Sequence, residues 1–220
     1  MATTLQGVMK TEVVFSDDKT ERFLLCKEWS ANDPTACLIM IHPSTANEVT
    51  NDATTGYAIA NLLKLGFGRL EITNITSAIV PKLDTKKKLT LSDENMDYIL
   101  KSAEKSDKVI LAWGKIGENN KRVSALQMKL LRKLSPFKDK LYVIANESGD
   151  MGFHPLAPQI RFHWELVKFV RPAYLQEKPE GETPADKPNT STGSEFTDPL
   201  PDELWTQNKG KNSRKETKPA

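Results

Sequence analysis

Four short β-prone runs, separated by segments of helical character, are the feature that most constrains how this 220-residue chain can fold. The runs are ACLIMI, LEITNI, KVILA and KLYVIA, at residues 36–41, 70–75, 108–112 and 140–145. Short runs rich in aliphatic residues and bounded by polar loops are typical of strands that a parallel sheet buries on both faces. We therefore predict that these four segments form the core strands of one sheet.

The segments between these runs place apolar residues at helical spacing. Residues 54–65 form the first predicted helix, and Gly66 follows where a helix would end. Two further helices are predicted, one capped by Ser92 or Asp93 and ending near residue 104, the other spanning residues 120–134. Strands joined by such helices form right-handed crossovers, so we predict a three-layer α/β/α domain with about four parallel strands.

The flanks of this core are predicted to add a hairpin and a last helix. Residues 12–15 and 22–26 alternate as β-strands around the turn-forming sequence SDDK, which predicts an N-terminal β-hairpin at an edge of the sheet. A last helix is predicted over residues 159–169. The expected domain covers residues 12–172, preceded by a flexible segment, residues 1–11.

Residues 173–220 are predicted to be a disordered tail. They contain six of the thirteen prolines among Glu, Lys, Thr, Ser and Asn, a composition that cannot bury enough apolar surface to offset the entropy of ordering. Within the tail, the sequence DPLPDELW from Asp198 to Trp205 is either a short motif for docking a protein partner or an isolated apolar patch.

Charge, cysteine content and missing motifs exclude several classes of protein. The tail holds nine acidic and seven basic residues, which leaves the domain with a mild excess of positive charge. The dense basic run of the domain, Lys86, Lys87 and Lys88, is either a solvated loop or a phosphate contact. Cys26 and Cys37 are too few for a zinc site and indicate buried thiols in a reducing, cytoplasmic protein. We expect no metal, no cofactor, no membrane span and no signal peptide. The dinucleotide-binding, Walker, nucleophile-elbow and metal-helix motifs are also missing.

The main functional signal is a set of polar residues that follow the predicted strands. In an open parallel sheet, ligands bind beyond the carboxyl ends of the strands, where these loops meet. The candidate catalytic residues are His154, Asp52 and His42, and the candidate substrate-binding residues are Ser44, Thr45, Asn47, Thr54, Asn74 and Trp113. Histidines that titrate near neutrality can act as acid or base, hydroxyls near a helix N-terminus can bind phosphate, and asparagines can read the edge of a base.

Each candidate also has a structural alternative. Either histidine can simply end a strand in a His-Pro turn, Asp52 can cap the helix that follows it, and Trp113 can belong to the core. Asn74 can satisfy backbone groups, and Ser44 with Thr45 can form a turn without a ligand. Because the candidates converge on one edge, the set as a whole points to a site more strongly than any one member does.

The order of several motifs resembles a bacterial and phage family of unknown function, DUF1643. The matching elements are FSDD with RFLLCKEW, LIMIHPSTAN with NDATTGYAI, LGFGRLEITNITS, VILAWG and HPLA, in this order across residues 12–170. This chain has His42 where the family usually has Asn before PSTA. It also lacks a basic residue that the family often carries after the position of Asn74.

The layout is also similar, more distantly, to the uracil-DNA glycosylase superfamily. This similarity implies that His154 contacts a base, that Asn74 reads it, and that the loop from Pro43 to Asn47 activates water. The superfamily's carboxylate at the tip of that loop is missing, and Asp52 is the one acid that can replace it.

Three functions remain open from the sequence. The first is a nucleobase- or nucleotide-directed hydrolase, resembling a glycosylase, in which Asp52 or His42 positions water and His154 stabilises the departing base. The second is a non-catalytic module that binds a nucleotide or nucleic acid through Ser44, Thr45 and the lysine run. The third is an interaction protein that works through its tail.

Overall fold

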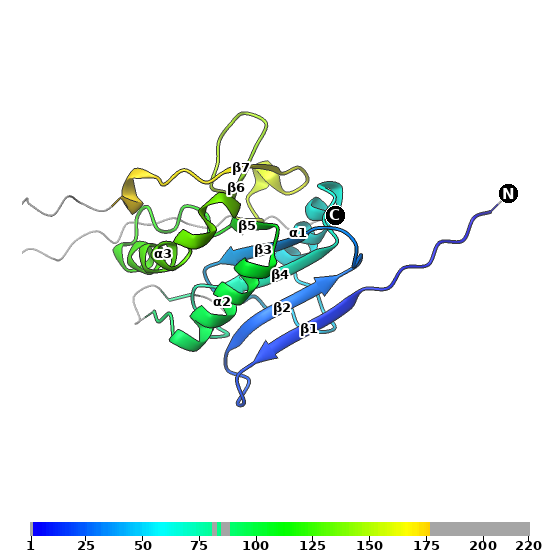
Figure 1. Cartoon of the computed structure of the whole chain (residues 1–220), viewed down its shortest axis with the longest axis horizontal. Helices are drawn as coiled ribbons and strands as arrows, with labels where there is room; N and C mark the ends of the chain where they lie inside the picture. Colours follow the sequence, from blue (N-terminus) through cyan, green and yellow to red (C-terminus); the bar gives the residue numbers. More distant parts are fainter. Residues whose placement is uncertain (1, 81–82, 85–88, 177–220) are drawn as a thin grey trace, which may run out of the picture. The chain divides into compact units, whose positions relative to one another are not determined.

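The chain forms a mixed seven-stranded sheet within the residues that the computed structural model describes, 2–80, 83–84 and 89–176 (Figure 1). The strand order across the sheet is β1-β2-β4-β3-β5-β6-β7. The strands are β1 (Lys10–Phe15), β2 (Arg22–Glu28), β3 (Thr35–Met40), β4 (Arg69–Asn74), β5 (Lys108–Leu111), β6 (Leu141–Ala145) and β7 (Glu165–Lys168).

The four predicted core strands are confirmed and run parallel to one another. β3 pairs with β4 on one side and with β5 on the other, and β5 pairs with β6. The chain therefore leaves β3 toward one edge to form β4, and then crosses back to form β5 and β6 on the opposite side. The loops after β3 and β5 diverge at this reversal, which is where ligands bind in open parallel sheets.

Three helices connect these strands, and each begins at a residue whose side chain caps it. They are α1 (Ala53–Lys64), α2 (Asp93–Lys105) and α3 (Lys121–Lys133). The caps are Asp52, Ser92 and Asn120, whose side-chain oxygens accept backbone N–H groups of the first turn. The helices predicted from the spacing of apolar residues are thus confirmed, with boundaries shifted by one or two residues.

The helices cover both faces of the sheet and make three layers. On one face, Cys37 and Ile39 of β3 belong to a buried cluster with Ile99 of α2 and Leu130 of α3. On the other face, Leu38 of the same strand belongs to a cluster that includes residues of α1. Alternate residues of β3 therefore supply two separate cores, which explains why its sequence is apolar throughout.

The predicted hairpin is confirmed at one edge of the sheet. β1 pairs antiparallel with β2, with a shift of register between Val14 and Phe15, and β2 pairs antiparallel with β4. β2 therefore lies between the hairpin partner and the parallel core.

The predicted helix at residues 159–169 is wrong. Residues Pro158–Ile160 form a single 3₁₀ turn, and Glu165–Lys168 form strand β7, which pairs antiparallel with β6. Ile160 and Trp164 are both buried, four residues apart. The open edge of β6 offers unpaired backbone groups to this segment, and pairing with them outweighs local helical preference.

The described structure continues past residue 172, the predicted end of the domain. Residues Ala173–Leu175 form a 3₁₀ turn, and Leu175 is fully buried in the core on the side of α3. The rest of the predicted tail, with the segment from Asp198 to Trp205, lies outside the described residues, as do Lys86, Lys87 and Lys88. At the other end, residues 2–9 have no regular secondary structure.

Both cysteines are free and buried, as the sequence predicted. Burial raises the pKa of the Cys26 thiol to about 11 and that of Cys37 to about 12, so both remain protonated near neutral pH. Among the described helices, none is long and apolar enough to cross a membrane.

Two glycine-to-alanine substitutions are expected to change stability in opposite directions. Gly56 lies inside α1 with nothing within 4 Å of an added Cβ, so Gly56→Ala should raise the free energy of unfolding by about 0.5–1 kcal/mol. At Gly68 an added Cβ would overlap the carbonyl oxygen of Ser30 and lie 2.7 Å from Cβ of Asp33. Gly68→Ala should therefore lower the free energy of unfolding by about 1–3 kcal/mol.

Urea denaturation of both variants beside the parent protein measures these changes. Destabilisation by Gly56→Ala, or no loss of stability in Gly68→Ala, would contradict the described packing of α1 and of the turn before β4.

Candidate functional site

A cavity of about 280 Å³ lies at the carboxyl ends of β3 and β5. It brings together five of the nine predicted site residues, from three different loops. The lining residues are Met40, Ile41, His42, Ser44, Thr54, Leu83, Trp113, Ile116, His154 and Leu156. Its volume is close to the lower limit of small-molecule sites, roughly 300–1,000 Å³, so it suits a small ligand.

His42 follows β3 directly and is half-buried at the wall of the cavity. Burial lowers the pKa of its imidazole below the ordinary value of 6.5, and the positive charge of Arg22 lowers it further. A neutral His42 has a nitrogen lone pair that can accept a proton.

His154 enters the cavity from the loop between β6 and β7. Its Nδ1 accepts the backbone N–H of Leu156 at 3.2 Å, so the neutral ring carries its proton on Nε2. Burial is the main cause that lowers the pKa of His154, and a charge on His42 lowers it further, while the Asp52 carboxylate opposes both. The two imidazoles therefore lie within electrostatic reach of each other, and both favour the neutral form.

A glycine after β5 allows the close approach of His154. Gly114 has φ of +67°, a conformation that L-residues with side chains seldom adopt, and an added Cβ would lie 3.2 Å from Cβ of His154. The loop that carries Trp113 and the loop that carries His154 thus pack directly against each other.

Asp52 has a confirmed structural role as the N-cap of α1. Its Oδ1 accepts the backbone N–H of Thr55 at 2.8 Å, and it is not among the residues that line the cavity. Its charge nevertheless acts on His154 and on Arg22. A catalytic role for Asp52 stays a prediction.

Two other predicted residues of this loop lie away from the cavity lining. Asn47 uses its Oδ1 to accept the backbone N–H groups of Val49 and Thr50, at 2.9 and 2.7 Å, and so builds the turn of the loop. Thr45 is exposed. The hydroxyl groups at the cavity come instead from Ser44 and Thr54.

Asn74 lies at the end of β4, beside Met40 of β3, and is 1% exposed. Its side-chain Oδ1 and Nδ2 form no hydrogen bond with any described residue, and it does not line the cavity. Its carbonyl oxygen accepts a hydrogen bond from Nδ2 of Asn95 at 2.9 Å. The structure therefore does not bring Asn74 to the histidines, and its role as a base reader stays a prediction.

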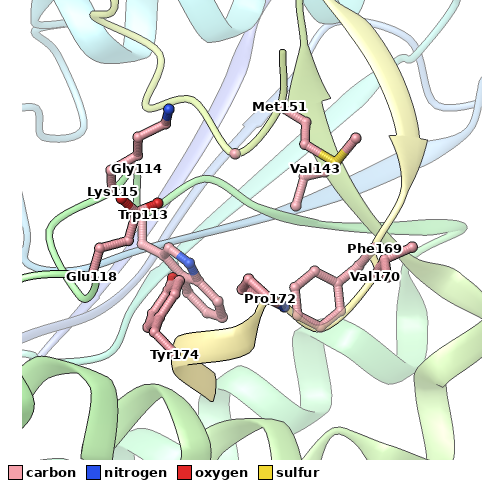
Figure 2. A pocket seen from close by; sticks show the side chains of 11 residues that line it. Trp113, Gly114, Lys115, Glu118, Val143, Met151, Phe169, Val170, Pro172 and Tyr174 are labelled. Carbon is pink, nitrogen blue, oxygen red and sulfur yellow. The ribbon is translucent and has the colours of Figure 1, made fainter. Parts of the chain in front are cut away.

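A second, smaller cavity of about 100 Å³ also has Trp113 in its lining (Figure 2). Tyr174, Pro172 and Phe169 contribute aromatic and apolar groups to it. Burial raises the pKa of the Tyr174 hydroxyl, and a nearby glutamate, Glu118, raises it further. Trp113 therefore lines both cavities.

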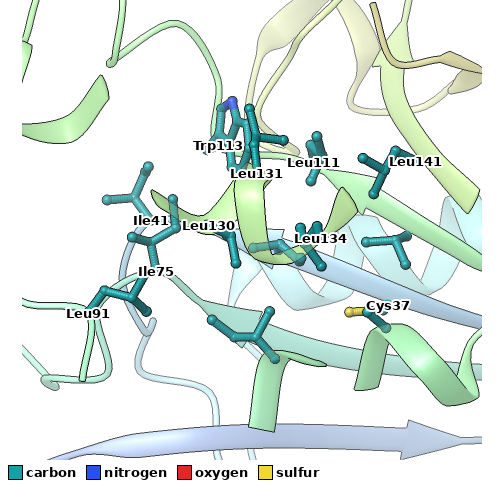
Figure 3. Close-up of a cluster of buried hydrophobic side chains, with 14 of the residues drawn as sticks. Cys37, Ile41, Ile75, Leu91, Leu111, Trp113, Leu130, Leu131, Leu134 and Leu141 are labelled. Atoms are coloured by element: carbon teal, nitrogen blue, oxygen red, sulfur yellow. The ribbon is translucent and has the colours of Figure 1, made fainter. Parts of the chain in front are cut away.

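Trp113 is at the same time part of the core. It is 5% exposed and belongs to the buried cluster on the side of α2 and α3, where Figure 3 shows it next to Leu131. The interpretation of Trp113 as a core residue is confirmed, and it also lines the cavity, while its role in binding a ligand stays a prediction.

Sequence reasoning missed two buried cations on β2. Arg22 is 1% exposed, and its Nη1 donates to the carbonyl oxygens of Ala46 at 2.6 Å and Ser44 at 3.3 Å. Lys27 is 2% exposed and donates to the carbonyl oxygen of Asn47 at 3.1 Å. Burial lowers the pKa of Arg22 to about 10 and also lowers that of Lys27. The sequence signal was the two positive charges of the strand RFLLCKE, which flank the apolar run FLLC.

No three His, Cys, Asp or Glu residues of the described part come close enough to hold a metal ion. The polar and aromatic side chains that line the cavity carry imidazole, hydroxyl and indole groups.

The fold and the cavity define an α/β protein with a site at the reversal point of its sheet. Residues 22–156 match the family described as "Protein of unknown function (DUF1643)", and the chain belongs to this family. No curated protein and no solved structure matches the chain. The similarity of layout to the uracil-DNA glycosylase superfamily therefore stays a prediction.

Acid should destabilise the protein through the two cavity histidines. Because their folded-state pKa values lie below 6.5, the unfolded chain binds more protons than the folded chain once the pH falls below that value. We expect their contribution to the free energy of unfolding to be constant above pH 6.5 and to be lost as the pH falls toward the folded-state pKa values.

Urea denaturation at about pH 7.5 and about pH 5.5 measures this loss. The double variant His42→Gln with His154→Gln should lose less stability between these two pH values than the parent. An equal loss in both proteins would show that these imidazoles are not held neutral by the fold.

Proposed function

We propose that the cavity binds a small ligand with a nucleobase and that the protein hydrolyses its glycosidic bond. The observation that carries this proposal is the meeting of two neutral imidazoles, those of His42 and His154, in one cavity beside the indole of Trp113. The residues are supplied by loops at the reversal point of a parallel sheet, the usual ligand position in such folds.

The walls of the cavity suit a flat, partly polar ring. Trp113 offers an aromatic surface, and Ile41 and Leu156 add apolar contacts. Ser44 and Thr54 offer hydroxyl groups that can donate or accept hydrogen bonds. A purely aliphatic ligand would leave these polar groups without partners, which disfavours it.

The two histidines take complementary roles in the proposed hydrolysis. Water attacks the anomeric carbon, and the bond from that carbon to the base breaks with its electron pair moving onto the base. His154, which carries its proton on Nε2, donates a hydrogen bond to the departing base. His42 accepts a proton from the attacking water, since its neutral form is favoured.

Asp52 contributes charge in this proposal. Its carboxylate acts on His154 electrostatically, and a negative charge near the cavity would stabilise the positive charge that develops on the sugar. We also propose a cytoplasmic location, which the two free, buried thiols support.

Substitution of His154 should remove hydrolysis without unfolding the protein. We expect His154→Ala to lower the rate of base release by about 10²–10⁴-fold, because a positioned acid–base group contributes about that much. The assay incubates the protein with a panel of nucleosides, nucleotides and a uracil-containing single strand, and separates freed bases by chromatography.

The third histidine provides a matched control. His163 is well exposed and lies outside the cavity, so His163→Ala should release base at the parent rate. Asp52→Asn keeps a good N-cap while removing the charge, so it separates capping from catalysis. Full activity in folded His154→Ala would exclude the proposed role, and binding without any base release by the parent would identify a non-catalytic module instead.

A further inference from the structure

The N-terminus of α1 opens onto the same cavity as the two histidines. Thr54, in the first turn of this 12-residue helix, lines the cavity and is 6% exposed. The N–H of Thr55 donates to the side chain of Asp52, and the N–H of Gly56 donates to the backbone carbonyl oxygen of Asp52. The N–H groups of Ala53 and Thr54 form no hydrogen bond within the described residues. Free N–H groups at the positive end of a helix dipole attract anions.

The hydroxyl groups beside this helix end also lack partners. Thr54 is 6% exposed and lines the cavity, and no side chain of the described residues is found in a hydrogen bond with its hydroxyl. Ser44, which lines the same cavity, has a buried Oγ that is likewise without a partner there. Buried polar groups in native proteins are almost always hydrogen-bonded, so two free hydroxyls in one cavity indicate a polar ligand.

A buried positive charge lies behind this part of the cavity. Arg22 reaches the connection from β3 to α1, where its Nη1 donates to the carbonyl oxygens of Ser44 and Ala46. Its Nε and Nη2 make no hydrogen bond in the described part of the chain. The negative charge of Asp52 raises the pKa of Arg22 from a longer distance. Among the described residues, however, Arg22 forms no ion pair within 4 Å. A buried guanidinium in this state favours a nearby anion.

We propose that the N-terminus of α1, with Thr54 in contact and with Ser44 and Arg22 behind, binds the phosphate group of the ligand. This proposal rests on the proposed function. The substrate is then a nucleoside monophosphate and not a free nucleoside. The phosphate is held by N–H and hydroxyl donors, and the base lies toward Trp113 and His154. A phosphodiester in single-stranded nucleic acid has related chemistry, and the experiment separates these two sources.

Calorimetric titration of the full chain with three probes tests the subsite. The probes are inorganic phosphate, a nucleoside 5′-monophosphate and the matching nucleoside. We expect the monophosphate to bind at least about tenfold more tightly than the nucleoside. Thr54→Val should weaken the binding of monophosphate and of inorganic phosphate by about tenfold or more and change nucleoside binding much less. Arg22→Met should weaken phosphate binding to a similar degree.

Two control variants match these substitutions. Lys27→Met removes another buried cation of β2 that also binds a loop carbonyl, but its charged neighbour is Glu48 instead of Asp52. Thr11→Val removes a hydroxyl on β1, at the edge of the sheet and three strands away from β3. Thr11→Val should change phosphate affinity by less than about twofold, and Lys27→Met should weaken it less than Arg22→Met does.

The outcomes distinguish this inference from the proposed function. Equal affinity for nucleoside and monophosphate, or unchanged phosphate affinity in folded Thr54→Val, would overturn the subsite while leaving base release by His154 intact. Phosphate binding that depends on Thr54, in a protein that releases no base, would support the subsite and overturn the hydrolase. If Arg22→Met does not fold, Thr54→Val decides alone. Binding of a single-stranded oligonucleotide without any binding of the monophosphate would overturn the assignment to a nucleotide.

Discussion

A guanidinium buried on an edge hairpin holds the loop that builds one side of the cavity. Arg22 donates to the carbonyl oxygens of Ala46 and Ser44, and Lys27 holds the carbonyl of Asn47. Carbonyl groups of a loop have no strand partners, and burying them without a donor would cost free energy. Charge-assisted hydrogen bonds from two cations satisfy them and fix the loop over the end of β3. The position of Ser44 at the cavity therefore depends on β2, a strand that contributes no lining residue.

The order of the strands explains why the remaining groups meet. β3 lies at the centre of the parallel core, and the chain leaves it toward β4 before returning to β5 and β6. The loops after β3, β5 and β6 consequently deliver His42, Trp113 and His154 to one place, where Gly114 removes the steric obstacle to their contact. Burial in this place keeps both imidazoles neutral, and the hydrogen bond from Leu156 sets the tautomer of His154. A site of this kind has its dipoles oriented before a ligand arrives.

Much of this arrangement could be predicted from the sequence because it follows local rules. Apolar runs predicted the four parallel strands, and apolar residues at helical spacing predicted the three helices. The rule for parallel sheets brought five of nine candidate residues to one cavity. The errors come from long-range effects. Residues Glu165–Lys168 became a strand because the edge of β6 was available to them. The burial of Arg22 could not be predicted, since its hydrogen-bond partners lie more than twenty positions further along the chain. Asn74 stands at the expected strand end, yet it is buried outside the cavity lining.

The central claim is that His42 and His154 form one coupled, neutral pair in one cavity, and NMR titration of the histidine side chains tests it most directly. Nitrogen-15 spectra of the parent near neutral pH should show two neutral rings, with the proton of His154 on Nε2. In His42→Gln, the pKa of His154 should rise, because a neighbouring positive charge has been removed. An unchanged His154 titration in that variant, or a His154 that is charged at neutral pH in the parent, would contradict the pairing of the two histidines.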